Sequence, residues 1–218
     1  MKSKTFRAAT VLIGTVVGAG IFAIPYVVAK IGFLPGIFYL LILGALVLFL
    51  NLIYGEVILR TPGDRQLTGY AEIYLGKWGK FLGTLAIFIT AYGALLAYLI
   101  KVGEFLSLIF ALPNPVLFSL LFFVFGSIAV FLGLRSVSFF AGVFVVLLLG
   151  LVSLIAILGG DKIDPVNFLG SDFSFLSLPY GVILFALFGS SVIPEMEEIL
   201  RTEHKSLKKS IVIGSLIP

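Results

Sequence analysis

The sequence predicts an all-α polytopic membrane protein. Of its 218 residues, 60% are hydrophobic and only 12% are charged, whereas soluble globular domains carry about 25% charged residues. Its mean hydropathy is +1.19. The apolar residues also fall into long runs, and a helix of about 20 apolar residues crosses a bilayer with all its backbone hydrogen bonds made. We therefore expect the lipid bilayer to be the main solvent of this chain.

Six apolar runs are long enough to cross a membrane as helices. They are Ala8–Val28, Phe33–Leu59, Phe81–Leu112, Pro115–Leu134, Val137–Leu158 and Pro179–Leu200. A seventh run opens at Ile211 and reaches Pro218, which gives about 12 Å of helix and is too short to cross. Between the runs, Thr61–Lys80 has an amphipathic centre that suits a short helix at the inner surface. Gly159–Ser177 mixes turn residues with aromatics and is expected to form an outer loop over a vestibule.

The distribution of Lys and Arg predicts the orientation of the chain. With the amino terminus in the cytoplasm, twelve of the fifteen basic residues fall inside: Lys2, Lys4, Arg7, Arg60, Arg65, Lys77, Lys80, Arg135, Arg201, Lys205, Lys208 and Lys209. Only Lys30, Lys101 and Lys162 fall outside. The positive-inside rule therefore places the amino terminus in the cytoplasm, in an inner or plasma membrane. The net charge of +4 reports this topology, so it does not predict a nucleic-acid partner.

Several classes of chemistry lack the residues that they need. The chain has no cysteine and one histidine, His204. The spans hold no cluster of His, Cys or paired carboxylates of the kind that catalysis or metal binding uses. We therefore expect no catalytic residue, no metal site and no cofactor, and a protein that is not an enzyme.

The first apolar run contains the glycine-rich string GTVVGAGIF, which begins at Gly14 and is followed by a proline. If the helix unwinds near Gly18, the freed amides form a half-helix amino terminus whose dipole suits a carboxylate. These amides belong to Ala19, Gly20 and Ile21. Alternatively, Gly14 and Gly18 let a neighbouring helix pack closely. The run alone leaves both interpretations open.

The sixth run carries FGSSVIPE, from Phe188 to Glu195, which places a glycine, two hydroxyls and a proline inside an apolar segment. A second break is expected here, because Pro194 has no amide donor and fits the first turn of a new helix. Ser190 and Ser191 can cap freed amides or face a polar ligand. The alternative is a continuous helix with a proline kink, in which the serines bond back to the preceding turn.

The two expected breaks lie in the first and sixth spans, which are the leading helices of two possible five-span halves. Interrupted helices at corresponding positions of two halves are a feature of secondary transporters, whose substrate site lies near the middle of the membrane. Unpaired peptide dipoles at both breaks would suit a zwitterion. The pairing therefore predicts a carrier of a small amino acid.

Three strings also resemble a known family. They are GTVVGAGIFAIPYVVAKIGFLPG (Gly14–Gly36), GALLAYLIKVGEFL (Gly93–Leu106) and FGSSVIPEMEEIL (Phe188–Leu200). They resemble the amino acid/auxin permease family and its close relatives, the hydroxy and aromatic amino acid permeases, within the amino acid/polyamine/organocation superfamily. The resemblance extends over nearly all of the chain.

The resemblance implies the leucine-transporter-type fold, an inverted five-plus-five repeat that works by alternating access. On this basis residues 1–158 form the first five-helix repeat, residues 159–178 an outer loop, and residues 179–218 the start of the second repeat with a truncated seventh helix. The remaining C-terminal helices, or partner chains that replace them, would then be needed for activity.

The resemblance also implies a substrate site between the two broken helices. Amides of the first break would bind the substrate carboxylate, carbonyls and hydroxyls of the second would receive the amino group, and Phe188 would act as a gate. The residues placed there are Gly18, Ala19, Gly20, Ile21, Phe188, Gly189, Ser190 and Ser191. Carbonyls near Gly14 and Val17 correspond to half of the sodium site of some relatives, and the other half would come from an eighth helix.

Four further residues carry polar groups near the expected site or the membrane surface. Glu195 follows the second break closely enough to act as a gate or proton carrier. Glu56 and Arg60 lie four residues apart, which favours an interfacial ion pair over proton coupling. The hydroxyl of Tyr92, on the third span, is a candidate contact for the substrate carboxylate, although core packing is the alternative.

Taken together, these features predict a secondary active transporter of amino acids, coupled to a proton or sodium gradient. The alternative is a non-transporting helical subunit or an inactive fragment that packs against partner chains through its glycine-rich faces.

Overall fold

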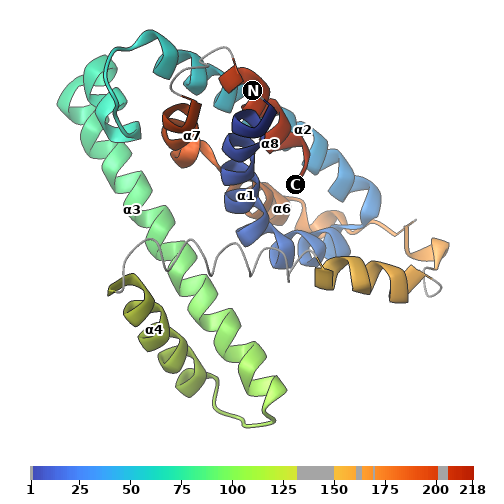
Figure 1. Ribbon diagram of the computed structural model, residues 1–218. Helices are drawn as coiled ribbons and strands as arrows, with labels where there is room; N and C mark the ends of the chain where they lie inside the picture. Colours follow the sequence, from blue (N-terminus) through green and yellow to red (C-terminus); the bar gives the residue numbers. More distant parts are fainter. Residues whose placement is uncertain (1, 132–149, 161–163, 169, 201–205) are drawn as a thin grey trace. The chain divides into compact units, whose positions relative to one another are not determined.

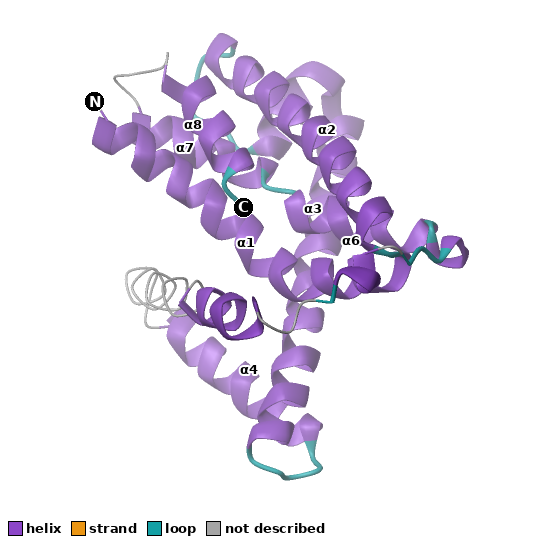
Figure 2. Ribbon diagram, turned by 90° about the vertical axis from the view of Figure 1, so that its right-hand side faces the viewer, coloured by secondary structure: helices purple, strands orange, loops and turns teal. Residues whose placement is uncertain are grey.

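The computed structural model describes residues 2–131, 150–160, 164–168, 170–200 and 206–218 (Figure 1). Within these ranges all regular secondary structure is helical (Figure 2). The chain divides into two compact units, one made of residues 1–80 and 162–218 and the other of residues 81–161. The predicted all-α architecture is confirmed for the described residues.

Over its described residues, the first unit contains five long or medium helices and three short 3-10 turns. The helices are α1 (Lys2–Ile31), α2 (Phe33–Arg60), α6 (Ser177–Leu187), α7 (Ile193–Leu200) and α8 (Ser206–Leu216), and the turns are Pro165–Phe168, Phe173–Phe175 and Ser190–Val192. Helix α3 (Leu67–Ile109) begins in this unit. Its direction changes at Gly76, where φ is +68°, a value that glycine adopts without steric cost. The expected short helix between the second and third spans is therefore present, as residues 67–75.

The expected runs and the observed helices agree closely at most ends. Among the described residues, three helical segments are long and apolar enough to cross a membrane: α2, α3 and Ser177–Leu200, which holds α6 and α7. The two halves of α1 make a fourth if they count as one bent span. Helix α4 (Pro115–Phe131) has 17 residues, at the short end of the spanning range. Only the end of the fifth run lies within the described residues, as the helix Gly150–Gly159.

The last helix differs from its prediction. The sequence places its start at Ile211, whereas α8 begins at Ser206 and includes two lysines. The helix is longer than its apolar run because residues at the membrane surface can be helical without being apolar. One consequence is that Lys208 is positioned by a helix rather than by a loop.

The core of the first unit lies where α1, α2, α7 and α8 meet. Its fully buried side chains include Leu12 of α1, Met196 of α7 and Ile211 of α8. A second cluster joins Val27 of α1, Leu43 of α2 and Ile183 of α6. Burying side chains of this size contributes about 1.5–3 kcal/mol each in water, but between helices in lipid the gain comes from close packing. These two clusters hold α1 against α6, α7 and α8.

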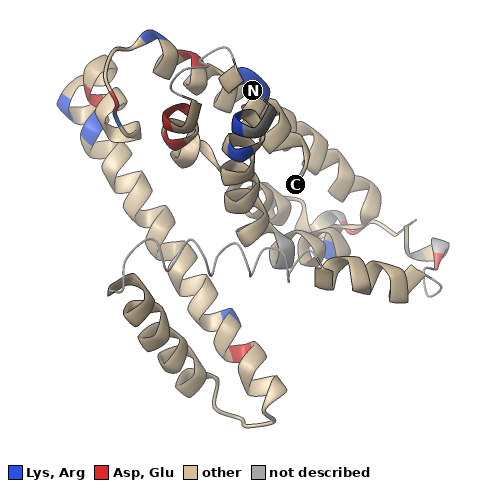
Figure 3. Cartoon of the chain, viewed as in Figure 1, with Lys and Arg blue, Asp and Glu red and all other residues tan. Residues whose placement is uncertain are grey.

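Charged side chains of the first unit gather at helix ends (Figure 3). Helix α1 carries no charge between Arg7 and Lys30. The start of α8 lies beside the start of α1, because Ser210 Oγ donates to the carbonyl of Thr5 at 3.1 Å. The basic ends of α1 and α8 therefore lie side by side, and Lys208 of α8 also pairs with Glu56 near the end of α2.

The second unit contains a hairpin of α4 and the part of α3 after residue 80 (Figure 1). Gly103 faces Ser119 so closely that a Cβ atom at Gly103 would collide with its hydroxyl. Ser119 Oγ donates to the carbonyl of Leu99 at 2.7 Å, and the rings of Phe110 and Phe118 stack with centroids 5.5 Å apart. Small residues at the contact let the two apolar helices approach, as they do in membranes.

Candidate functional site

The first candidate break is a sharp bend of α1. Its two halves, Lys4–Gly18 and Ala23–Ile31, meet at an angle of 55°. The helical assignment nevertheless continues through the bend, so the backbone is bent here rather than unwound at residues 18–20. Pro25 contributes to the bend, because it has no amide to donate to the carbonyl of Ile21. The bend therefore lies at the glycine-rich string of the sequence. The group that it leaves without a helical partner is a carbonyl and not a set of amides.

The second candidate break is a true interruption. Helix α6 ends at Leu187, and Phe188 has an extended backbone with φ −69° and ψ 111°. Gly189 follows with φ −132° and ψ 10°, then one 3-10 turn, Ser190–Val192, and helix α7 begins at Ile193. Pro194 lies in the first turn of the new helix, where its missing amide costs nothing. The continuous kinked helix is therefore the wrong alternative for this segment.

The bend and the interruption lie against each other. A Cβ atom at Gly20 would lie 3.3 Å from the Cβ of Ala186, one residue before the end of α6. A Cβ atom at Gly189 would collide with the Cδ1 atom of Leu12 and lie 3.3 Å from Val16, both on α1. The absence of a side chain at both glycines is what lets α1 approach the interrupted helix. These contacts bring the two glycine-containing strings of the sequence together.

A buried polar contact ties the interruption to α2. Ser190 Oγ donates a hydrogen bond to Asn51 Oδ1 at 2.7 Å. Asn51 lies in the middle of α2 and is 1% exposed. Its Nδ2 atom has no hydrogen-bond partner among the described residues. The interrupted segment therefore carries a buried amide that still has hydrogen-bonding capacity.

Asn51 belongs to none of the motifs that the sequence suggested. Its signal in the sequence is a lone amide inside the otherwise apolar string LGALVLFLNLIYG. Polar residues inside spans are rare and usually face the interior of a bundle. That rule would have selected Asn51, but its partner lies 139 residues away in the sequence, so the pairing had no local sign.

The remaining candidate residues do not all converge. Tyr92 belongs to the second unit, where its ring stacks on Phe88 with centroids 6.1 Å apart. Glu195 lies in the first turn of α7 and is exposed. Gly14 faces open space, since no atom lies within 4 Å of the place of a Cβ. The geometry of the first unit therefore unites Gly20, Gly189 and Ser190, with Asn51 added.

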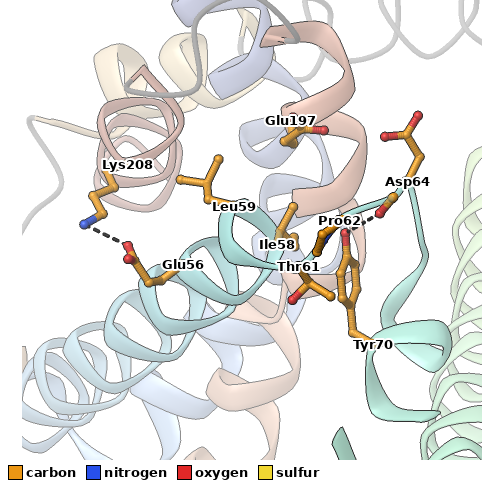
Figure 4. A pocket seen from close by; sticks show the side chains of 10 residues that line it. Glu56, Ile58, Leu59, Thr61, Pro62, Asp64, Tyr70, Glu197 and Lys208 are labelled. Atoms are coloured by element: carbon orange, nitrogen blue, oxygen red, sulfur yellow. Dashed lines mark hydrogen bonds and ion pairs between the residues drawn. The ribbon is translucent and has the colours of Figure 1, made fainter. Parts of the chain in front are cut away.

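A polar cavity of about 600 Å³ lies at the charged end of the first unit (Figure 4). It is lined by the end of α2, the connection to α3, and residues of α7 and α8. Glu56 Oε1 accepts from Arg60 Nε at 2.6 Å, and Oε2 accepts from Lys208 Nζ at 2.9 Å. The expected Glu56–Arg60 pair is present, and a third member from α8 joins it. This ion-pair group connects α2 to α8, which supports a structural role for Glu56.

The long apolar helices, the charges near helix ends and the interrupted span define a polytopic integral membrane protein. The chain belongs to the tryptophan/tyrosine permease family, whose sequence profile matches residues 1–218. The resemblance to amino acid permeases, made on three short strings, is thereby confirmed over the full chain.

Individual relatives support the same membership. The chain is similar to tyrosine-specific transport system 1 of Haemophilus influenzae, with 29% identity over 219 residues that cover 99% of this chain and 54% of that protein. It is 26% identical to glutamine transporter 2 of Aliivibrio fischeri over 230 residues, 100% of this chain and 58% of the other. It thus spans little more than half the length of these relatives. No solved structure matches it significantly.

Proposed function

We propose that this chain forms the substrate-binding part of a secondary active amino acid transporter that works by alternating access. The supporting observation is the interruption at Phe188–Gly189 packed against the bend of α1, in a chain of the permease family. A rigid continuous bundle would offer no unpaired backbone groups inside the membrane. The interruption supplies such groups, and interrupted helices are where transporters of the inverted-repeat type bind their substrates.

The proposed substrate is a neutral amino acid. The last carbonyls of α6 carry the negative end of its helix dipole and suit an ammonium group. Ser190 and Ser191 add hydroxyls beside them, and Phe188 is the proposed gate. On the side of α1, the amides of Gly18, Ala19, Gly20 and Ile21 are proposed to bind the carboxylate when the helix opens at its bend during transport. The relatives are named for tyrosine and glutamine, so these are the first substrates to test.

Uptake by the purified native protein in liposomes tests this function. Labelled tyrosine or glutamine is expected to accumulate above its equilibrium level only when a proton or sodium gradient is imposed, and an ionophore that collapses the driving gradient should abolish the accumulation. Gradient-independent equilibration would overturn secondary active transport. Failure of both amino acids to bind would overturn the proposed function itself and favour a non-transporting subunit.

The same liposome assay identifies the coupling ion. A proton mechanism assigns Glu195 the role of carrier, whereas a sodium mechanism assigns the carbonyls near Gly14 and Val17 to the ion. Glu195→Gln should abolish proton-driven accumulation while exchange of labelled for unlabelled substrate continues, because exchange needs no net proton movement. Full accumulation by Glu195→Gln would exclude this residue as the carrier.

The proposed orientation, with the amino terminus in the cytoplasm, is tested by labelling with a thiol reagent. This chain contributes no cysteine, so a single introduced cysteine gives a clean signal. In intact cells, a membrane-impermeant maleimide is expected to label Asp164→Cys and to leave Arg65→Cys unlabelled until the membrane is opened. The reverse pattern would invert the topology.

A further inference from the structure

The contact between Asn51 and Ser190 is unusual for its surroundings. Asn51 is buried on a helix whose other buried positions, apart from glycines, are Leu43, Val47 and Ile58. An amide there cannot be explained as a surface residue that reaches the membrane interface. Leucine fills a similar space, so packing alone does not require the polar group. The amide therefore needs an explanation in terms of its hydrogen bond.

The hydrogen bond reaches the one part of the sixth span where the backbone is not α-helical. Ser190 opens the 3-10 turn that joins the extended residue Phe188 to helix α7. Inside this turn the amide of Val192 donates to the carbonyl of Gly189 at 3.2 Å, and the amide of Ile193 donates to the carbonyl of Ser190. A single 3-10 turn has poorer hydrogen-bond geometry than an α-helix, so it depends on its neighbours for a fixed conformation. Asn51 is the neighbour that supplies a directional contact.

Asn51 also has a hydrogen-bonding group that is not used. The structure leaves its Nδ2 atom without a partner among the described residues. If the amide were turned over, Ser190 could accept from Nδ2 and the oxygen would be left instead, so one polar group stays unpaired in either orientation. A buried polar group of this kind is destabilising. Its presence in the fold indicates a role other than stability.

We propose that Asn51 is a positioning residue of the transport site: it holds the hydroxyl of Ser190, and with it the interrupted segment, in the conformation that receives the substrate. This inference rests on the proposed transport function. Without the contact, the segment must be ordered at the moment of binding, and that ordering weakens the affinity. Asn51 acts through Ser190 and needs no contact with the substrate.

A mutant cycle in the purified native protein tests the inference by equilibrium binding of labelled tyrosine or glutamine. Asn51→Leu keeps the size of the side chain and removes its acceptor, and it is expected to raise Kd about three- to tenfold. In a Ser190→Ala background the same change should have no further effect, because the contact is already lost. Asn51→Asp, which keeps the shape and the acceptor, should bind within about twofold of the wild type.

Thermal stability separates positioning from ordinary support of the fold. The double variant Asn51→Leu, Ser190→Ala removes two buried polar groups together, so its Tm should equal or exceed that of the wild type while its Kd stays raised. A purely structural Asn51 would instead lower the Tm and leave the Kd of the folded fraction unchanged. Should Asn51→Leu not insert, the double variant and Asn51→Asp still measure the two predictions.

Three results would overturn the inference. The first is an unchanged Kd for Asn51→Leu when the wild type binds normally, which leaves the transport function intact. The second is a full additional loss from Asn51→Leu in the Ser190→Ala background, which would mean that Asn51 acts independently. The third is a wild-type protein that binds no amino acid, in which case the proposed function fails first and this inference fails with it.

Discussion

Gly189→Val is expected to reduce amino acid uptake by the native protein at least tenfold while leaving membrane insertion intact. The backbone at Gly189, with φ −132° and ψ 10°, is accessible to residues other than glycine, so strain is not the reason. The reason is contact: a Cβ atom there would collide with Leu12 of α1. Overpacking of a close contact costs about 1–3 kcal/mol or forces the two elements apart. Either result displaces the interruption from the bend of α1.

Gly181→Val is the matched control for this substitution. Gly181 lies on the same span, in α6, and no atom lies within 4 Å of the place of its Cβ. Both variants lose a glycine and gain the same side chain, and only one of them meets α1. Initial uptake rates and the amount of inserted protein are measured together. Equal uptake by the two variants would show that the close approach at Gly189 is not needed.

Gly20→Leu is expected to abolish uptake as well. A Cβ atom at Gly20 would lie 3.1 Å from Ile24 and 3.3 Å from Ala186. The side chain of Ile24 can rotate, but Ala186 has no rotatable atom to move, so the added leucine pushes α6 away from the bend. The same substitution also crowds the proposed partner of the substrate carboxylate. Uptake and surface expression in cells measure the two effects separately.

Gly44→Leu serves as the comparison, because a Cβ atom there would lie 3.9 Å from Leu187, an ordinary contact. It should insert and transport at close to the wild-type rate. Normal uptake by Gly20→Leu would refute the role assigned to this part of α1, whatever the result for Gly189.

Some features of the site could be predicted from the local sequence and others could not. The interruption after Leu187 was predictable because glycine, two serines and a proline lie together in an apolar run. For α1 the sequence left both an unwound segment and a closely packed helix open, because glycines lower helical stability without dictating whether the backbone opens. The start of α8 was not predicted, because Lys208 and Lys209 are charged and therefore lie outside the apolar run.

Contacts between residues that are distant in the sequence could not be predicted, because they depend on how the helices pack. The amide of Asn51 and the hydroxyl of Ser190 are each ordinary in isolation, and their contact depends on the packing of α2 against the interrupted span. The third member of the Glu56 group, Lys208, also comes from a distant helix. The roles of Gly14, Val17, Glu195 and Tyr92, and the division into repeats, stay predictions.

The hydrogen bond from Ser210 to the carbonyl of Thr5 joins residues that are 205 positions apart. Around it, Leu12 packs beside Gly214, and both lie in the region where the first and last helices meet. During synthesis the ribosome makes α1 well before α6, α7 and α8, which supply most of its neighbours in the described structure. Until α6, α7 and α8 are synthesised, α1 must therefore be surrounded by lipid or by the insertion machinery. Only afterwards can it pack against these helices.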